Sequence, residues 1–279
     1  MQETLAPWDQ LPMYAISDEL APTIQELSLR RNLDELRVNG YTVIEVEREL
    51  TDRIRTATLR AVEGAPGPNS SFDLAFATPL GEDPVFEEAC THPAALALAE
   101  YICGRGCTLS SVLATVRVAG SALGLHCDQS QVPAPFPEHL VNLTACWVTD
   151  EFTKANGAFM IIPGTHRNRR NPTPEEGQAL DGAIAVECPP GSVVLWDGAV
   201  WHGNYPRTEP GQRVVLHVTY TRLAYRPVHD FSYLTDDFRA GASPQIRALL
   251  GDNLGFGANS RFVHIDAERY LQMAMDVRR

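Results

Sequence analysis

The sequence predicts a mainly β domain, either a sandwich or a closed barrel, with helices before and after it. Residues 108–225 contain short β-branched and apolar runs separated by glycine and proline, which is typical of sandwiches and barrels. Residues 1–107 and 226–279 instead place apolar residues at helical spacing. We therefore expect one domain over residues 1–279: a mostly helical N-terminal part, a β core and a helical C-terminal tail.

The N-terminal part is predicted to be helical with one strand. Its apolar residues recur near helical spacing between Pro22 and Gly40, and a β-branched run follows directly. The predicted elements, in order, are a helix over 22–39, a strand over 41–46, a helix capped by Thr51, a loop over 64–71, and helices over 84–90 and 92–103.

The core is predicted to consist of short strands, each ending near a turn residue. The predicted strands cover residues 112–118, 125–128, 141–148, 159–162, 192–196 and 213–221, and the best helices of the tail cover 244–250 and 266–277.

Composition and charge narrow the class of protein. The net charge of −12 argues against nucleic-acid binding, which needs a basic patch. The longest apolar run, residues 94–103, contains Glu100 and is too short to cross a membrane. The N-terminus shows no signal-peptide pattern, so we expect a cytoplasmic protein. The six cysteines lack metal-site spacing and are expected to be reduced.

His126 and Asp128 form the first half of a candidate metal site. They are two residues apart in Gly-Leu-His-Cys-Asp-Gln, so on a strand both side chains point to the same face. Cys127 between them must point the other way, where we expect it to pack rather than bind metal. The alternative is a hydrogen-bonded surface pair, because His-x-Asp is common by chance.

His202 in Trp-His-Gly-Asn completes the candidate set. Two imidazoles and one carboxylate can occupy one face of octahedral iron(II) and leave three positions open. The ordinary alternative is a core histidine packed beside two tryptophans. We predict that His126, Asp128 and His202 bind iron, and we predict no catalytic residue beyond these ligands.

Arg213 gives the predicted iron site further support. Strand alternation places it on one face with Val215, His217 and Thr219, and a charged side chain on a half-buried face is costly without an anion. The carboxylate of a keto acid would pair with it in bidentate fashion. A salt bridge to a protein carboxylate is the alternative. His217 competes for a ligand role but is better explained as lining the cavity.

Taken together these segments resemble the phytanoyl-CoA dioxygenase family of Fe(II)/2-oxoglutarate-dependent oxygenases. The resemblance covers roughly residues 108–225. It implies a double-stranded β-helix, the jelly roll of cupin-like proteins, with 2-oxoglutarate on Arg213 and O2 as the other cosubstrate. It also suggests that Asn142, Thr144 and Trp147 face the cosubstrate. The matching segments are His126-x-Asp128, Asn156-Gly-Ala-Phe-Met-Ile-Ile-Pro-Gly-Thr-His-Arg167, Gly191-Ser-Val-Val-Leu-Trp-Asp197, His202 and Arg213.

Two positions qualify the resemblance. Related members often carry Gln two residues before the first ligand, where this chain has Gly124, so we expect no cosubstrate contact there. Halogenating relatives carry a small residue at the position of Asp128, so its presence favours oxygen transfer. The implied reaction is hydroxylation of an unactivated C–H bond coupled to conversion of 2-oxoglutarate to succinate and CO2.

The substrate is expected to be a small or medium, largely apolar metabolite of secondary metabolism. The loop over 65–78 with Phe72 and Phe76, the segment 129–139 with Phe136, and the tail around 231–238 are aromatic and weakly charged, and loops over a rigid core usually carry specificity. A non-catalytic, cupin-like metal binder is the alternative function, although it has no need of an inward Arg213. Helices packed on the outside of the barrel could form the interface of a homodimer.

Overall fold

The computed structural model describes residues 15–63, 74–120 and 122–252, and its core is two antiparallel β-sheets. The larger sheet has the order β1-β8-β5-β10-β3-β2 and the smaller has the order β4-β9-β6-β7. The strands are β1 (Tyr41–Glu45), β2 (Leu74–Ala77), β3 (Thr108–Val118), β4 (Leu123–His126), β5 (Asn142–Val148), β6 (Phe159–Ile162), β7 (Ile184–Val186), β8 (Ser192–Asp197), β9 (Trp201–Asn204) and β10 (Gln212–Thr221).

Helices precede, interrupt and follow the strands. The helices are α1 (Ala21–Glu26), α2 (Arg30–Asn39), α3 (Arg48–Glu63), α4 (Pro84–Thr91), α5 (Pro93–Cys103), α6 (Pro174–Ala179), α7 (Asp236–Gly241) and α8 (Pro244–Leu249), with 3₁₀ turns η3 (Thr165–Asn168) and η4 (Phe231–Tyr233).

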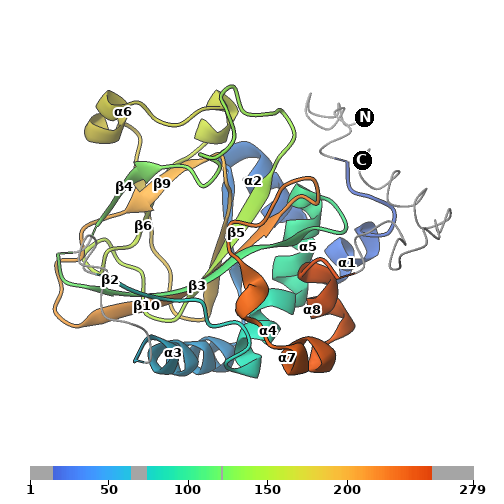
Figure 1. Ribbon diagram of the computed structural model, residues 1–279. Helices are drawn as coiled ribbons and strands as arrows, with labels where there is room; N and C mark the ends of the chain where they lie inside the picture. The colour runs from blue at the N-terminus through green and yellow to red at the C-terminus, as the bar shows by residue number, and fades with distance from the viewer. Residues whose placement is uncertain (1–14, 64–73, 121, 253–279) are drawn as a thin grey trace.

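The molecule has three layers. Figure 1 shows β4, β9 and β6 on one side of the long strands β3 and β10, and helices α3, α4 and α7 on the other side. Helices α3 and α5 pack directly on the large sheet. The large sheet is therefore covered on both faces, and every residue of β5 and β8 is buried.

The two faces of the large sheet contribute to separate apolar clusters. One cluster joins the helices to outward residues such as Leu143, Trp147 and Leu216. A second, between the sheets, contains inward residues such as Val148 and Trp196. The register of β5, β8 and β10 sets this alternation, because Thr144 lies opposite both Trp196 and Thr219, and opposed residues share a face.

Most of the predicted core strands are confirmed to within a few residues, and three short strands were missed. The strand over 159–162 is confirmed, and the long β3 begins four residues before its predicted start. The strand predicted over 125–128 ends instead at His126, so Asp128 lies just beyond β4. The missed strands are β2, β7 and β9, each only three or four residues long.

The predicted helix over 22–39 is two helices. Ser28 adopts a left-handed conformation with φ of 54°, which an α-helix cannot continue through, and α1 ends just before it. The third helix starts at Arg48 rather than at a Thr51 cap. The Thr51 hydroxyl instead donates to the carbonyl of Arg48 at 2.9 Å, a bond typical of a helix interior.

Two further expectations concern the C-terminal tail and helices that could cross a membrane. The helix predicted over 266–277 lies outside the described residues. Among the helices described, none has the length and apolar character that crossing a bilayer requires.

Candidate metal centre and cosubstrate site

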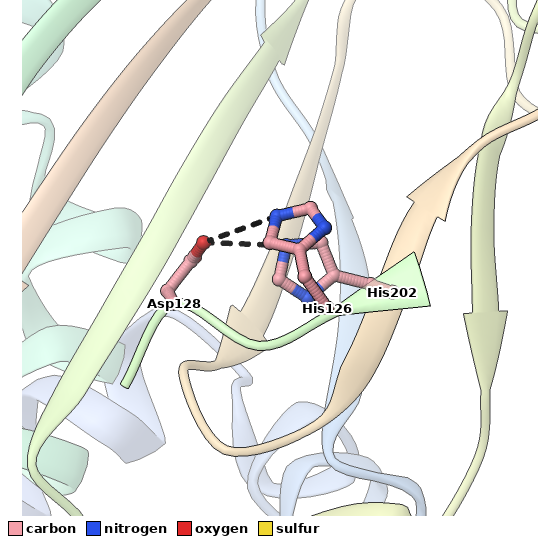
Figure 2. A group of neighbouring side chains, drawn as sticks. All are labelled: His126, Asp128 and His202. Carbon is pink, nitrogen blue, oxygen red and sulfur yellow. Dashed lines mark ion pairs between the residues drawn. The ribbon is translucent and has the colours of Figure 1, made fainter. Parts of the chain in front are cut away.

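The three predicted metal ligands converge. His126 at the end of β4 lies opposite His202 in the antiparallel pair of β4 and β9, and the imidazole centroids are 4.3 Å apart. Asp128 Oδ1 lies 3.3 Å from His202 Nε2 and 3.7 Å from His126 Nε2. Figure 2 shows both rings turned toward this carboxylate oxygen. One ligand atom from each residue lies within 4.8 Å of the others, so a single ion can contact all three.

Backbone carbonyls fix which nitrogen of each imidazole is free. His126 Nδ1 lies 2.9 Å from the Gly124 carbonyl oxygen, and His202 Nδ1 lies 3.0 Å from that of Val200. A carbonyl only accepts hydrogen bonds, so each Nδ1 carries the proton. In the neutral imidazoles Nε2 is then the nitrogen with the lone pair, and in both residues it is Nε2 that lies toward Asp128, as in a metal ligand.

The Asp128 carboxylate divides its two oxygens between different partners. Oδ1 faces the histidines, whereas Oδ2 accepts hydrogen bonds from Thr144 Oγ1 and Trp196 Nε1, both at 2.9 Å. Cys127 points away, as predicted: its thiol donates to Asn171 Oδ1 at 2.9 Å and the residue packs in a third apolar cluster.

The surroundings of Asp128 and His126 shift the pKa values of both groups in the direction that favours cation binding. Burial is the largest single influence and would raise the pKa of the Asp128 carboxyl, but His202, His126 and the hydrogen bond from Thr144 together bring that pKa well below its ordinary value. Burial and then the neighbouring His202 lower the pKa of His126 to about 4. At neutral pH the group thus holds an ionised carboxylate and an unprotonated His126, and metal binding has no proton to displace from either.

Gly203 allows β9 to come close to β4. A Cβ at this position would lie 2.4 Å from the Leu123 carbonyl oxygen and 2.9 Å from that of Gly124. Gly203 lies inside β9, where only a missing side chain permits this approach.

Arg213 is buried between the sheets without an anionic partner. Its side chain is 2% exposed, its guanidinium carbon lies 4.9 Å from the centre of the Phe152 ring, and Nε and Nη1 have no hydrogen-bond partner. Within the described part of the chain no carboxylate forms an ion pair with it; Asp150 instead pairs with Arg55 at 3.0 Å. The alternative of a structural salt bridge therefore finds no support.

A second buried arginine lies beside the first. Arg117 on β3 is directly opposite Arg213 on β10, is 6% exposed, and has an Nε without a partner. Burial, followed by the charge of Arg117, lowers the pKa of Arg213 to about 10. Two adjacent desolvated cations favour an anion between them.

A cavity of about 260 Å³ extends from Arg117 to the metal ligands; Arg213 lies beside Arg117 but is not among the residues that line the cavity. Arg117 forms part of its wall, and so does His217, which the structure places beside the metal group but not within it. Burial, followed by the charge of Arg117, lowers the pKa of His217 to about 3, so this imidazole stays neutral. The cavity is lined by Ser111, Leu113, Thr115, Arg117, Leu123, His126, Asp128, Thr144, Phe159, Trp196, His202, Asn204, His217 and Thr219.

A larger groove of about 1020 Å³ lies elsewhere, between α2, β1 and the junction of α4 and α5. It includes His92, which is only 3.9 Å from Glu47. The one group of three metal-ligating side chains found among the described residues is in the smaller cavity, so chemistry is assigned there.

Two of the residues predicted to face the cosubstrate do not line this cavity. Trp147 alternates to the helix side of β5 and packs edge-on against His92 at 5.4 Å, because it is three residues from Thr144 and strands alternate. Asn142 is on the correct face but lies against the turn at Gly198, where a Cβ would approach its Oδ1 to 1.7 Å. Thr144 is the one of the three that lines the cavity.

The predicted substrate-binding phenylalanines gain no support. Phe136 is 1% exposed and packs with Ala199 and Trp201 in the third cluster, away from the cavity wall. Phe72 lies outside the described residues, and Phe76 is described only as backbone, in β2 opposite Thr115. The tail also packs elsewhere, since Phe231 belongs to the cluster beneath the helices.

Three contributors to the site were missed. Arg117 had a readable signal, because it is a cation within a strand that is otherwise apolar or weakly polar. Thr219 shares the face predicted for Arg213. Trp196 gave no signal, since only the pairing of β8 with β5 brings its indole to Asp128.

The model of the phytanoyl-CoA dioxygenase family matches residues 36–215, more than half of the chain. The chain belongs to this family. The resemblance predicted from the motifs is thus confirmed, and the match covers β1 to the first residues of β10, including all three candidate ligands and Arg213.

Curated relatives match part of the chain. Dioxygenase af480 of Aspergillus fumigatus is 28% identical over 194 residues, which cover 67% of this chain and 62% of the fungal protein. Rv1501 of Mycobacterium tuberculosis is 24% identical over 99 residues, which cover 36% of each protein. The chain therefore spans less than two thirds of the length of these relatives.

Solved structures of similar fold confirm the predicted jelly roll. HygX from Streptomyces hygroscopicus, crystallised with nickel, 2-oxoglutarate and hygromycin B, has a TM-score of 0.61 and 18% identity, and the match covers 75% of this chain and 94% of HygX. The epimerase SnoN, in complex with Fe3+, α-ketoglutarate and nogalamycin RO, has a TM-score of 0.61 and 18% identity over 78% of this chain and 93% of SnoN.

Proposed function

We propose that the protein is an Fe(II)/2-oxoglutarate-dependent dioxygenase that hydroxylates an unactivated C–H bond of a small or medium, largely apolar metabolite. Conversion of 2-oxoglutarate to succinate and CO2 accompanies the reaction. The observation that carries the proposal is the combination of a convergent His126, Asp128 and His202 group with a buried, unpaired Arg213.

The donor set fits iron(II). Two neutral imidazole nitrogens and one carboxylate oxygen are the facial set of non-haem iron oxygenases. His126 and His202 come from the small sheet and Asp128 follows its strand β4, so the three donors would hold an ion at the wall of the cavity. Bound iron and 2-oxoglutarate supply the oxidising chemistry, and the chain's own residues bind and orient the reactants.

The arginines fit the keto acid. Arg213 has buried N–H groups without partners, and a guanidinium can bind a carboxylate in bidentate fashion. Arg117 adds a second positive charge beside it. A cosubstrate whose far carboxylate pairs with these arginines would extend toward the metal ligands, and its fixed orientation would lower the entropic cost of reaction.

The rest of the wall supports an apolar substrate. Leu113, Leu123 and Phe159 line the cavity, and the polar wall residues near them, such as Ser111 and Asn204, are uncharged. Drug-sized ligands typically occupy pockets of roughly 300–1,000 Å³, so the cavity of about 260 Å³ admits the cosubstrate and only the part of the substrate that carries the target C–H. Binding of hygromycin B by HygX and of nogalamycin RO by SnoN agrees with small-molecule substrates.

Anaerobic titration of the Fe(II)-loaded protein with 2-oxoglutarate tests the proposal. We expect the weak visible charge-transfer band of an iron-bound keto acid. Arg213→Ala should keep iron binding but weaken 2-oxoglutarate binding by roughly 10- to 100-fold, since hydrogen bonds to charged groups contribute about 1.5–3 kcal/mol. Exposed Arg31→Ala is the matched control and should leave the titration unchanged.

Iron binding without the band would contradict the proposal and favour the non-catalytic metal-binding jelly roll. If the band appears, succinate release in a screen of apolar metabolites then identifies the substrate class. Succinate formed only with charged substrates would refute the apolar part of the proposal.

A further inference from the structure

We propose that Trp196, together with Thr144, is a positioning residue that holds Asp128 as a ligand through a single oxygen. The inference deepens the proposed function and rests on it, because it concerns how the same three side chains receive iron. Both residues line the cavity, and the role proposed here acts through their hydrogen bonds to Asp128.

The hydrogen bonds in this arrangement are all donated toward Asp128 Oδ2. An indole N–H can only donate, so the 2.9 Å contact from Trp196 Nε1 to Asp128 Oδ2 is a donor to the carboxylate. Thr144 Oγ1 also donates to Oδ2 at 2.9 Å and lies 3.0 Å from Thr219 Oγ1. Since its one proton goes to Asp128, Thr144 must accept from Thr219, and a chain of donors ends on Oδ2.

These donors come from three residues that lie opposite one another on adjacent strands of the large sheet. Thr144 on β5 lies opposite Trp196 on β8 and opposite Thr219 on β10. Asp128, by contrast, follows β4 of the small sheet. The hydrogen bonds therefore tie a carboxylate beyond the end of one sheet to three adjacent strands of the other, and the ligand geometry depends on how the sheets are spaced.

The Trp196 ring is itself held firmly. It is 2% exposed, and its centroid lies 4.4 Å from that of Phe159, 5.1 Å from that of His202 and 6.0 Å from that of His217. A ring packed on three sides cannot follow a moving carboxylate. Oδ2 is thus kept on the large sheet, and Oδ1 alone is left toward the histidines.

The consequence concerns the number of open positions. A carboxylate that bound through both oxygens would occupy an extra position on the metal. With Oδ2 held by two donors, Asp128 would offer a metal only Oδ1, and three positions would stay open for 2-oxoglutarate and O2. Partners of this kind typically change metal affinity by 10- to 100-fold when removed.

The test uses the metal alone. Metal-free protein is titrated anaerobically with Co(II), whose visible spectrum reports both affinity and coordination. Trp196→Phe and Thr144→Val should each weaken binding by roughly 10-fold and change the spectrum, whereas Thr144→Ser, which keeps the hydroxyl, should restore both toward wild type.

Trp147→Phe is the matched control. It is the same substitution in a buried tryptophan of the large sheet, but its indole N–H has no hydrogen-bond partner and it lies on the opposite face. We expect wild-type Co(II) affinity and spectrum. Should Trp196→Phe fail to fold, the Thr144→Val and Thr144→Ser pair decides the question.

The outcomes separate this inference from the proposed function. Wild-type affinity and spectrum in both Trp196→Phe and Thr144→Val would overturn the positioning role, even if 2-oxoglutarate still gives its band. A wild-type protein that binds Co(II) and Fe(II) without that band would refute the dioxygenase but not the positioning role. A wild-type protein that binds neither metal would refute both.

Discussion

The two faces of strands β5 and β10 differ sharply although one backbone builds both. The outward face packs under the helices and is almost entirely apolar, whereas the inward face carries the charged and hydrogen-bonding groups of the cavity. The outward residues are Leu143, Ala145, Trp147, Leu216, Val218 and Tyr220, and the inward residues include Thr144, Cys146, Arg213, His217 and Thr219.

The difference shows that stability and chemistry are divided by strand alternation. Outward side chains gain free energy by leaving water. Inward groups such as Arg213 and His217 are desolvated, and burial lowers the pKa of each, so they cost stability until a ligand arrives. Substitutions on the two faces should therefore have opposite signatures.

Loss of a metal ligand should have the largest effect. His202→Ala should weaken Fe(II) binding by more than roughly 100-fold, because removing even an indirect partner of a ligand costs 10- to 100-fold. Metal titration checks this. His217→Gln changes an inward histidine outside the ligand group and should bind Fe(II) like the wild type; a comparable loss there would make His217 a ligand.

An outward substitution should leave the site intact while destabilising the fold. Leu216→Ala should lower the free energy of unfolding by about 2–5 kcal/mol, the usual cost of a fully buried leucine. Urea unfolding of the metal-free protein measures the loss. Fe(II) affinity below the denaturation range should stay unchanged, and a coupled loss of both would contradict the separation of the two faces.

Removing the charge of Arg213 from the inward face should have the opposite effect: a more stable fold and a weaker site. Arg213→Met should raise the free energy of unfolding by about 1–3 kcal/mol, because a buried cation without a partner is replaced by an apolar chain. The 2-oxoglutarate band should at the same time require roughly 10- to 100-fold more 2-oxoglutarate to appear. A drop in stability would show that Arg213 makes a favourable interaction in the free protein.

The smallest expected effect is a dependence of stability on pH. The pKa of His217 is about 3 in the folded protein and near 6.5 when unfolded. The unfolded state takes up the proton first, so stability falls as pH drops below about 6.5. Between pH 7 and 5 the wild type should lose roughly 1–2 kcal/mol more than His217→Gln in urea unfolding.

The difference in pH dependence between the wild type and His217→Gln reports on His217 alone. Other histidines with lowered pKa values, such as His166 at about 4, are present in both proteins and cancel. Parallel stability curves for the two proteins would mean that His217 is not desolvated in solution.

Local patterns predicted a large part of the fold. The longer strands, such as β5 and β10, and helices α4 and α5 were found because their β-branched runs and Pro-initiated helical spacing act over neighbouring residues. Strands β7 and β9 have three and four residues, too few for a period to show. Ser28 gave no warning that it would break a helix.

The sequence by itself determined the metal ligands as candidates and the face on which Arg213 lies, since spacing and alternation are local properties of the chain. It also determined the family, through motifs that the match over residues 36–215 confirms. Alternation along the predicted strand could have separated Trp147 from Thr144, but it could not rank Thr144 above Asn142, because these two share one face of the strand.

Only the tertiary structure decided which side chains meet across sheets. The pairing of β4 with β9 brings His126 to His202 over 76 residues of chain, and the pairing of β8 with β5 brings Trp196 to Asp128. The same packing leaves Arg213 without a carboxylate and sets Arg117 beside it. These contacts depend on register between distant segments, which no local pattern records.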